Sequence, residues 1–109
     1  MSSTAEPTRL DAPRKCKIAD SLAIVGDRWS LLVIREITLG VRRFSDIRAN
    51  TGAPREILTN RLRKLEQAGV IERQRYNERP PRDEYVLTSA GRGLKPVLRS
   101  LRQWGERYT

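Results

Sequence analysis

The amino-acid sequence predicts a mainly α-helical domain with one small antiparallel β-hairpin. Three observations support this prediction. Apolar residues recur at helical spacing over most of the chain. Glycines follow several of these periodic runs, as they commonly follow helices. Two β-branched residues, Val70 and Ile71, open the first of two short extended segments. The length of 109 residues predicts a single domain.

The beginning of the chain differs in composition from the rest. Residues 1–15 are rich in Ser, Thr, Pro and charged residues and show no periodicity. We therefore expect a flexible N-terminal arm over residues 1–15, followed by the folded domain over residues 16–109.

Two helices are predicted next. A first helix over residues 18–25 ends at Gly26, and a second, nearly apolar helix over residues 28–39 is expected to be central. Asp27 is expected to cap the second helix, because its carboxylate can accept the free N–H groups of the first turn. Trp29 is expected to be a core or interface anchor. The apolar positions of the first helix are Ile18, Leu22 and Val25.

A helix-turn-helix is predicted over residues 45–68. Ser45 is expected to cap a short helix that ends at Asn50, and Gly52 lies in the turn that follows. The second helix covers residues 54–68, with Pro54 in its first turn, where a missing N–H costs nothing. The shared core is expected to contain Phe44, Ile47, Leu58 and Leu62.

A basic hairpin follows the second helix directly. Strands are predicted over residues 70–76 and 84–88, joined by a loop over residues 77–83. Pro80 and Pro81 stiffen this loop and place its tip outside the sheet, because proline has no N–H to donate. Three arginines surround the loop: Arg75, Arg79 and Arg82. A helix-turn-helix followed by such a hairpin is typical of a winged helix-turn-helix.

The last predicted helix runs to about Tyr108 and is capped by Thr88 or Ser89, with Pro96 inside it as a possible kink. Its apolar stripe is too long for the helix over residues 18–25 to cover. We therefore predict a homodimer through the N- and C-terminal helices. The predicted dimerisation residues are Ile18, Leu22, Trp29, Leu94, Leu98, Leu101, Trp104 and Tyr108.

Charge and composition restrict the function. The net charge is +9 with a pI of about 10.8, and residues 40–82 hold eleven Lys and Arg against five Asp and Glu. Such an excess predicts an anionic partner. The chain has no histidine and one cysteine, so no nucleophile–base pair can be written, and neither an enzyme nor a cofactor or metal is expected. No apolar run reaches membrane-spanning length, so we expect a cytoplasmic, nucleoid-associated protein.

The polar face of the helix over residues 54–68 predicts contacts with double-stranded DNA. Arg55 and Arg63 can donate two hydrogen bonds to guanine, Asn60 can pair with adenine, and Thr59 suits a thymine methyl group or a phosphate. Arg61 and Arg73 are expected to be structural or surface residues. The full set of predicted DNA-binding residues is Arg42, Arg43, Pro54, Arg55, Glu56, Thr59, Asn60, Arg63, Arg75, Arg79 and Arg82.

Cys16 has two readings. The neighbouring Arg14, Lys15 and Lys17 would stabilise a thiolate, which is what a redox or electrophile sensor requires. Alternatively, Cys16 is a small packing residue before a helix. Because no second cysteine exists in the chain, sensing would need a bridge between two subunits, a mixed disulfide or direct alkylation.

Five segments in one order resemble the HxlR-type winged helix-turn-helix transcriptional regulators. They are GDRWSLL (26–32), GVRRFSDI (40–47), ILTNRLRKLEQAGVIER (57–73), RPPRDEYVLTSAGRGL (79–94) and LRQWGERY (101–108). The resemblance implies a dimeric bacterial regulator, related in fold to the MarR-type regulators, that binds inverted-repeat operators. It implies a recognition helix that begins at Pro54 and a wing from Arg75 to Arg82. It also matches Cys16 to the family's N-terminal cysteine, which senses electrophiles or oxidants in several relatives.

Two alternatives remain open at this stage: an RNA-binding protein and a winged helix used for protein–protein contact. The sequence lacks the exposed aromatic pattern that stacks RNA bases. A protein-contact module should lose little affinity as salt rises, whereas DNA binding should weaken steeply. The sequence does not identify the operator, the regulated genes, the sign of regulation or any small-molecule or oxidant effector.

Overall fold

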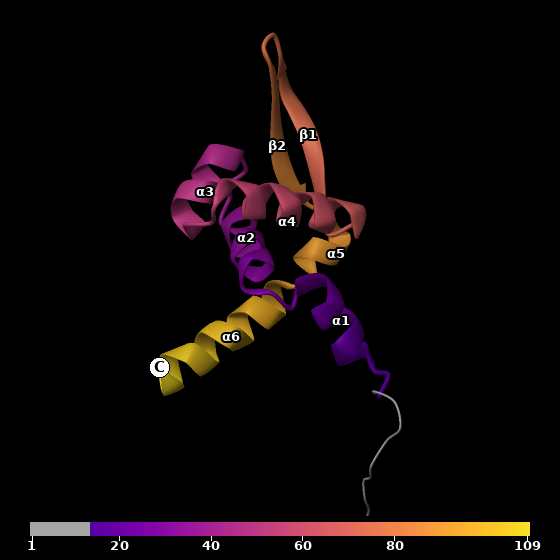
Figure 1. Cartoon of the computed structure of the whole chain (residues 1–109). Coiled ribbons are helices and arrows are strands. Elements are labelled where there is room, and N and C mark those ends of the chain that lie inside the picture. The colour runs from indigo at the N-terminus through magenta and orange to yellow at the C-terminus, as the bar shows by residue number, and fades with distance from the viewer. Residues whose placement is uncertain (1–13) are drawn as a thin grey trace, which may run out of the picture.

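The structure, a computed structural model, describes residues 14–109. Most of the predicted N-terminal arm, residues 1–13, therefore lies outside the described residues. Six helices and two strands follow one another in the described part of the chain (Figure 1). They are α1 (Lys17–Val25), α2 (Arg28–Thr38), α3 (Phe44–Thr51), α4 (Arg55–Gln67), β1 (Ile71–Glu78), β2 (Pro81–Leu87), α5 (Ser89–Arg92) and α6 (Lys95–Tyr108).

The architecture confirms the predicted fold class, a mainly helical winged helix-turn-helix. β1 and β2 form one antiparallel hairpin, which projects from the helices, while α1 and α6 lie at the opposite end of the domain (Figure 1). Within residues 14–109, every helix is too short or too polar to cross a lipid bilayer.

The central element is α2, as its apolar sequence predicted. It packs against α1, α3, α4, β2 and α6, and its residues Val33, Ile34 and Ile37 are buried. Because this one helix contacts four other helices and a strand, its inward face organises a single apolar core. The buried apolar residues of this core are Val25, Val33, Ile34, Ile37, Ile47, Ala53, Leu58, Leu62, Leu65, Val70 and Ile71.

Asp27 caps α2, as predicted, and also holds α4. Its Oδ2 atom accepts hydrogen bonds from the N–H groups of Trp29 at 3.1 Å and Ser30 at 3.0 Å, and Oδ1 accepts from the Ser30 hydroxyl at 2.6 Å. Arg61 of α4 donates to Oδ2 from Nε at 2.8 Å. Partial burial alone would raise the pKa of Asp27, but the bonds from Ser30 and Arg61 outweigh it and hold the pKa below its usual value.

This arrangement makes the stability of the protein sensitive to Asp27. Asp27→Ala should lower the free energy of unfolding by about 1–2 kcal/mol, because a helix cap and an ion pair are both lost. Asp27→Asn keeps a good capping side chain and should cost less. Since the folded pKa is lowered, the stabilisation by the charge exists above the unfolded pKa of about 3.9 and disappears as pH falls through the folded value.

Urea unfolding of the wild type and Asp27→Asn at about pH 7 and about pH 3 measures this effect. The difference between the two proteins should shrink in acid. A difference that stays constant between the two pH values would show that the Asp27 charge contributes nothing to stability.

The start of α3 differs from the prediction. The N-cap is Arg43, not Ser45, and it has no side-chain capping bond. Phe44 begins the helix and packs half-buried against the core, so the helix starts where this ring must turn inward. Asp46 still lies in the first turn, where its charge is favourable, and Gly52 ends the helix in a left-handed conformation. Pro54 likewise occupies the N-cap of α4 rather than its first turn.

The wing is longer and its loop shorter than predicted. β1 extends to Glu78 and β2 starts at Pro81, so that only Arg79 and Pro80 join the strands. Pro81 fits because the first position of a strand does not require an N–H donor in the ladder. The predicted loop over residues 77–83 was therefore too long, and Pro81 belongs to β2 rather than to the loop.

The predicted last helix is two helices. Thr88 caps the four-residue α5 by accepting from the N–H of Gly91 at 3.2 Å, and α6 starts afresh after Leu94. Pro96 lies in the first turn of α6, where proline is tolerated, and produces no kink inside a longer helix. The reason is that proline inside a continuous helix would remove one hydrogen bond and clash with the preceding turn.

Gly69 turns the chain from α4 into the wing, as predicted. Its φ of 76° lies in the left-handed region, and the N–H groups of Gly69 and Val70 bond the carbonyls of Glu66 at 3.0 Å and Leu65 at 2.9 Å. Gly91 of α5 lies against this turn, because a Cβ atom there would be 2.3 Å from the Val70 carbonyl oxygen. α5 thus fixes the position at which the wing leaves α4.

Candidate nucleic-acid interface

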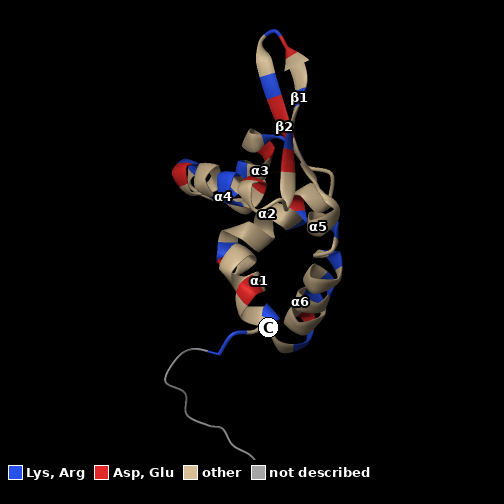
Figure 2. Cartoon of the chain, turned by 90° about the vertical axis from the view of Figure 1, so that its right-hand side faces the viewer, with Lys and Arg blue, Asp and Glu red and all other residues tan. Residues whose placement is uncertain are grey.

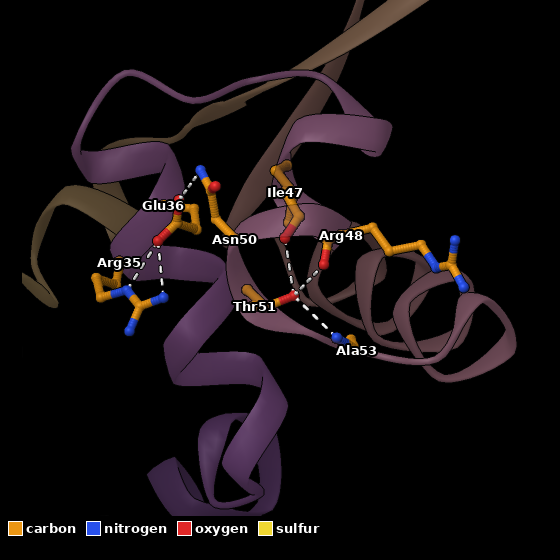
Figure 3. Close-up of polar contacts among 7 residues, drawn as sticks. All are labelled: Arg35, Glu36, Ile47, Arg48, Asn50, Thr51 and Ala53. Carbon is orange, nitrogen blue, oxygen red and sulfur yellow. Dashed lines mark hydrogen bonds and ion pairs between the residues drawn. The ribbon is translucent and has the colours of Figure 1, made fainter.

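The turn between α3 and α4 is held by Thr51. Its hydroxyl donates to the Ile47 carbonyl at 2.8 Å and accepts from the N–H of Ala53 at 3.3 Å (Figure 3). Ala53 is itself buried in the core. These contacts fix the direction in which α4 leaves the turn and therefore the face that it presents.

A buried carboxylate joins α2 to α3. Glu36 of α2 is only 4% exposed, and its Oε1 atom accepts from Asn50 Nδ2 at 2.8 Å (Figure 3). Its Oε2 atom accepts from Arg35 Nε at 2.9 Å and forms an ion pair with Arg35 Nη2 at 2.8 Å. Because both oxygens have charged or polar partners, the cost of burying the carboxylate is offset.

Sequence reasoning missed this network. Glu36 shares the inward face of α2 with Val33 and Ile37, and an acidic residue on an apolar stripe is the signal that could have identified it. The partner Asn50 lies fourteen residues away and gives no such signal.

α4 presents its two faces as the periodicity predicted. Leu58, Leu62 and Leu65 are buried, and the polar residues between them point outward. All eleven predicted DNA-binding residues are exposed, which is the condition for contact with a large partner. They are Arg42, Arg43, Pro54, Arg55, Glu56, Thr59, Asn60, Arg63, Arg75, Arg79 and Arg82.

Two of these arginines stack on aromatic rings, which the sequence did not reveal. The Arg43 guanidinium carbon lies 4.4 Å from the centroid of the Tyr76 ring, and that of Arg55 lies 5.3 Å from Phe44. Each stack joins two elements: Arg43 precedes α3 and Tyr76 belongs to β1, while Phe44 begins α3 and Arg55 begins α4. Stacking restricts the directions in which these guanidinium groups point.

Asn60 is also held in the free protein, because its Oδ1 atom accepts from Arg61 Nη1 at 2.7 Å. Arg61 bonds Asp27 as well, so it has the structural role that we expected for it. If the Asn60 amide contacts a base, its Oδ1 atom must either accept a second hydrogen bond or lose the one from Arg61.

The arginines of the wing fall into two groups. Arg75 forms ion pairs with Asp83 at 3.4 Å and Glu78 at 3.7 Å, and Arg73 lies 3.9 Å from Glu66 and 4.0 Å from Asp83. Within residues 14–109, no carboxylate lies within ion-pair distance of Arg79 or Arg82. Residues 71–87 hold four Arg and four Asp or Glu, so the hairpin carries no net charge. Its two arginines without a carboxylate partner in the described chain lie near the tip, where Figure 2 also shows a basic segment.

The base of the wing is joined to the segment before α3. The Tyr85 N–H of β2 donates to the Arg42 carbonyl at 2.8 Å, which adds a backbone bond beside the hairpin. Burial is the chief cause that raises the pKa of the half-buried Tyr85 phenol. The positive charge of Arg73 lowers this pKa, and the negative charges of Glu66 and Asp83 raise it further.

The predicted dimerisation residues divide into exposed and packed groups. Ile18, Leu22, Leu101, Trp104 and Tyr108 are exposed, with Leu101 at 50% and Trp104 at 60%. Trp29, Leu94 and Leu98 are half-buried and pack against the core of the same chain. The exposed group lies on α1 and α6, at the end of the domain away from the wing (Figure 1).

The apolar surface of α6 is hollowed. A wide-open depression of about 740 Å³, closer to a flat surface than to an enclosed cavity, is lined by residues of α6 alone: Pro96, Val97, Ser100, Leu101 and Trp104. Trp104 and Tyr108 lie with their ring centroids 5.2 Å apart along the same side of the helix. Large contiguous apolar surfaces on small soluble domains are typical of sites for protein contact.

Cys16 lies at the N-cap of α1 and is exposed. Its Sγ atom accepts a hydrogen bond from the N–H of Ala19 at 3.4 Å. The thiol therefore does not belong to the core of the described chain and is exposed beside the exposed apolar residues of α1.

Comparison with known proteins identifies relatives that are helix-turn-helix transcriptional regulators. A model of the family described as HxlR-like helix-turn-helix matches residues 24–109. The chain is 45% identical over 91 residues to the HTH-type transcriptional regulator Rv3095 of Mycobacterium tuberculosis, an alignment that covers 84% of this chain. The same alignment covers 58% of that relative, so the chain spans little more than half of its length.

Solved structures share the fold. A MarR-family protein from Porphyromonas gingivalis superposes with a TM-score of 0.77 and 26% identity, over 93% of this chain and 100% of that chain. The redox regulator HypR in its oxidised form has a TM-score of 0.74 and 32% identity, over 86% of this chain and 98% of that chain. Because the family model matches most of the residues of the described fold, the chain belongs to the HxlR-like helix-turn-helix family of transcriptional regulators, which is not a class of enzymes.

Proposed function

We propose that the protein is a sequence-specific regulator of transcription that binds double-stranded DNA. The single observation that supports this most strongly is that the polar residues of α4 and the arginines near the tip of the wing are all exposed. Arg55, Asn60 and Arg63 point outward from the helix, and Arg79 and Arg82 lie near the tip of the hairpin without a carboxylate partner within residues 14–109. A helix of this kind fits the major groove, and the wing fits the backbone or the minor groove.

The residues have different roles in this proposal. Arg55 and Arg63 read guanine, Asn60 reads adenine, and Thr59 contacts a thymine methyl group or a phosphate. Arg42 and Arg43 contact phosphates and so set the position of the protein on the duplex. Arg79 and Arg82 enter the minor groove or lie on the backbone, whereas Arg75 must first be released from Asp83 and Glu78.

A homodimer on an inverted repeat is the assembly that we propose. The exposed apolar residues of α1 and α6 would be covered by their two-fold mates, since a two-fold axis pairs identical surfaces. Two recognition helices would then lie about one helical turn of DNA apart, with an affinity on the order of nanomolar for the operator.

Replacing Arg63 tests base recognition. Arg63→Ala should cost about 1–3 kcal/mol of binding free energy, concentrated at one base pair of each half-site, if the contact is to a base. Binding to a panel of single-substituted operators measures this cost. Arg102→Ala removes the same charge from α6, away from the proposed interface, and serves as the control. Equal losses on every sequence would assign Arg63 to phosphate instead.

Control by oxidants or electrophiles at Cys16 is part of the proposal. The thiol is exposed, follows Arg14 and Lys15, and precedes the proposed dimer surface of α1. HypR, a structural neighbour, is a redox regulator. Diamide should weaken operator binding by the wild type, and a thiol reductant should restore it. A small-molecule effector is the alternative means of control.

Cys16→Ser is a matched variant for this prediction, because serine is also a good N-cap residue for α1. The variant should bind the operator normally and should not respond to diamide. A wild type that binds equally well with and without diamide would remove Cys16 as a sensor and leave the DNA-binding proposal intact.

The decisive experiment is a salt titration of binding to a promoter fragment from the protein's own locus. Tight binding that weakens steeply with salt and exceeds binding to random duplex is expected. Binding with no preference over random duplex would overturn the proposal of a specific regulator. Preference for RNA, or salt-insensitive association with a protein, would favour the two alternatives.

A further inference from the structure

We propose that Tyr76 is a positioning residue, which aims the Arg43 guanidinium at a DNA phosphate and fixes the angle of the wing to the helix-turn-helix. The inference rests on the proposed DNA binding and adds to it a residue that sequence reasoning did not select. It comes from one juxtaposition: the Tyr76 ring on β1 lies under the Arg43 guanidinium at 4.4 Å.

Tyr76 occupies an irregular position in the hairpin. Arg75 pairs with Asp83 and Asn77 pairs with Arg82, so Tyr76 is an extra residue on β1 with no partner on β2. Such β-bulges leave one residue outside the ladder and commonly redirect a side chain. Tyr76 as a residue is 37% exposed, so it does not belong to the buried core. The position of the ring is thus specified chiefly by the bulge and by Arg43.

The stack is a contact that links the outer part of the wing to the remainder of the domain. Arg75 bonds Asp83 and Glu78, which both belong to the hairpin itself. Of the polar and cation–π contacts that residues 75–82 form within the described chain, the Arg43–Tyr76 stack alone leaves the hairpin. Loss of the ring should therefore free the outer wing to change its angle.

The stack also orients the Arg43 guanidinium in a way that favours binding of an anion. An aromatic ring covers one face of a guanidinium but leaves the N–H groups at its edge free to donate. Within residues 14–109, Arg43 has no ion-pair partner and its side chain donates no hydrogen bond, in contrast to Arg75. A guanidinium that is already oriented loses less side-chain freedom when it binds a phosphate, so affinity rises without an added contact.

A double-mutant cycle tests this coupling. The variants are Tyr76→Leu, Tyr76→Phe, Arg43→Ala and the double variant Arg43→Ala/Tyr76→Leu. The probe is a fluorescein-labelled mixed-sequence duplex of about 30 base pairs, long enough for two half-sites, followed by anisotropy across a range of salt concentrations. A mixed sequence is sufficient because phosphate contacts do not depend on the bases.

The expected results follow from the stack. Tyr76→Leu should weaken binding about fivefold, whereas Tyr76→Phe should bind like the wild type because the ring is kept. Arg43→Ala should reduce the slope of log K against log salt by about 0.9, the value for one phosphate. In the Arg43→Ala background, Tyr76→Leu should weaken binding far less than it does in the wild type, because it acts through Arg43.

Three results would overturn the inference: unchanged binding by Tyr76→Leu, an equal loss with Tyr76→Phe, or a loss from Tyr76→Leu that is undiminished in the Arg43→Ala background. A general loss of folding is distinguished by thermal unfolding of each variant.

A measurement without DNA separates this inference from the proposed function. The Arg43 side-chain protons should show an upfield NMR shift from the Tyr76 ring, which persists in Tyr76→Phe and disappears in Tyr76→Leu. If the wild type shows the shift but binds no duplex, the proposed function fails while the stack stands. If the wild type binds duplex without the shift, the stack fails while the proposed function stands.

Discussion

Leu101→Glu is expected to convert the proposed dimer into a monomer and to weaken operator binding by roughly a hundredfold or more. Leu101 is half exposed and lines the apolar hollow on α6, next to Trp104. A carboxylate there would have to be buried without a partner at a two-fold interface, and it would occur twice. A monomer can contact only one half-site of the operator. It therefore loses the gain in affinity that two linked DNA-binding domains provide.

Gln103→Glu provides the control for this prediction. It adds the same charge to α6 two residues away, outside the apolar stripe. Light scattering coupled to size-exclusion chromatography gives the mass of each variant, and anisotropy gives its affinity for the promoter fragment. A Leu101→Glu variant that remains dimeric would contradict the proposed interface. A monomer that keeps full affinity would show that the dimer is not needed for DNA binding.

Leu58→Ala should lower the free energy of unfolding by about 3–5 kcal/mol. Leu58 is completely buried on the inner face of α4, where it belongs to the core shared with α2 and α3. The substitution removes three side-chain carbon atoms and leaves a cavity that the neighbouring helices fill only in part. Because a domain of this size has a total stability of about 5–15 kcal/mol, the loss should lower the melting temperature by roughly 10 °C or more.

Leu39→Ala is the matched control, because Leu39 is 71% exposed and the chemical change is identical. Its effect should stay within about 0.5 kcal/mol. Urea unfolding at one protein concentration compares the two, since the stability of a dimer depends on concentration. Equal effects of the two substitutions would show that the described core does not determine stability.

Much of the fold could be predicted because it depends on local chemistry. The apolar spacing of Leu58, Leu62 and Leu65 predicted both the recognition helix and its buried face, and the structure confirms them. Asp27 and Gly69 were predicted at a cap and a helix end because a short carboxylate and a residue without Cβ suit those positions.

The boundaries that were wrong depended on packing or on competing local preferences. Ser45 is a better capping residue than Arg43, yet α3 starts at Phe44 because the ring packs against the core. Pro96 was placed inside one long helix, whereas the chain begins a new helix there. Pro81 was assigned to a loop, but it pairs with Glu78 and is the first residue of β2.

The sequence by itself determined the helix-turn-helix, the wing, the basic charge and the exposed face of α4, since each follows from spacing, turn chemistry or residue type. The tertiary structure alone decided which groups are held before any partner binds: Glu36 with Asn50, Arg61 with Asp27 and Arg43 with Tyr76. The members of these pairs lie between 14 and 34 residues apart in the chain. No local periodicity reports such contacts, because they arise only when the core brings the elements together.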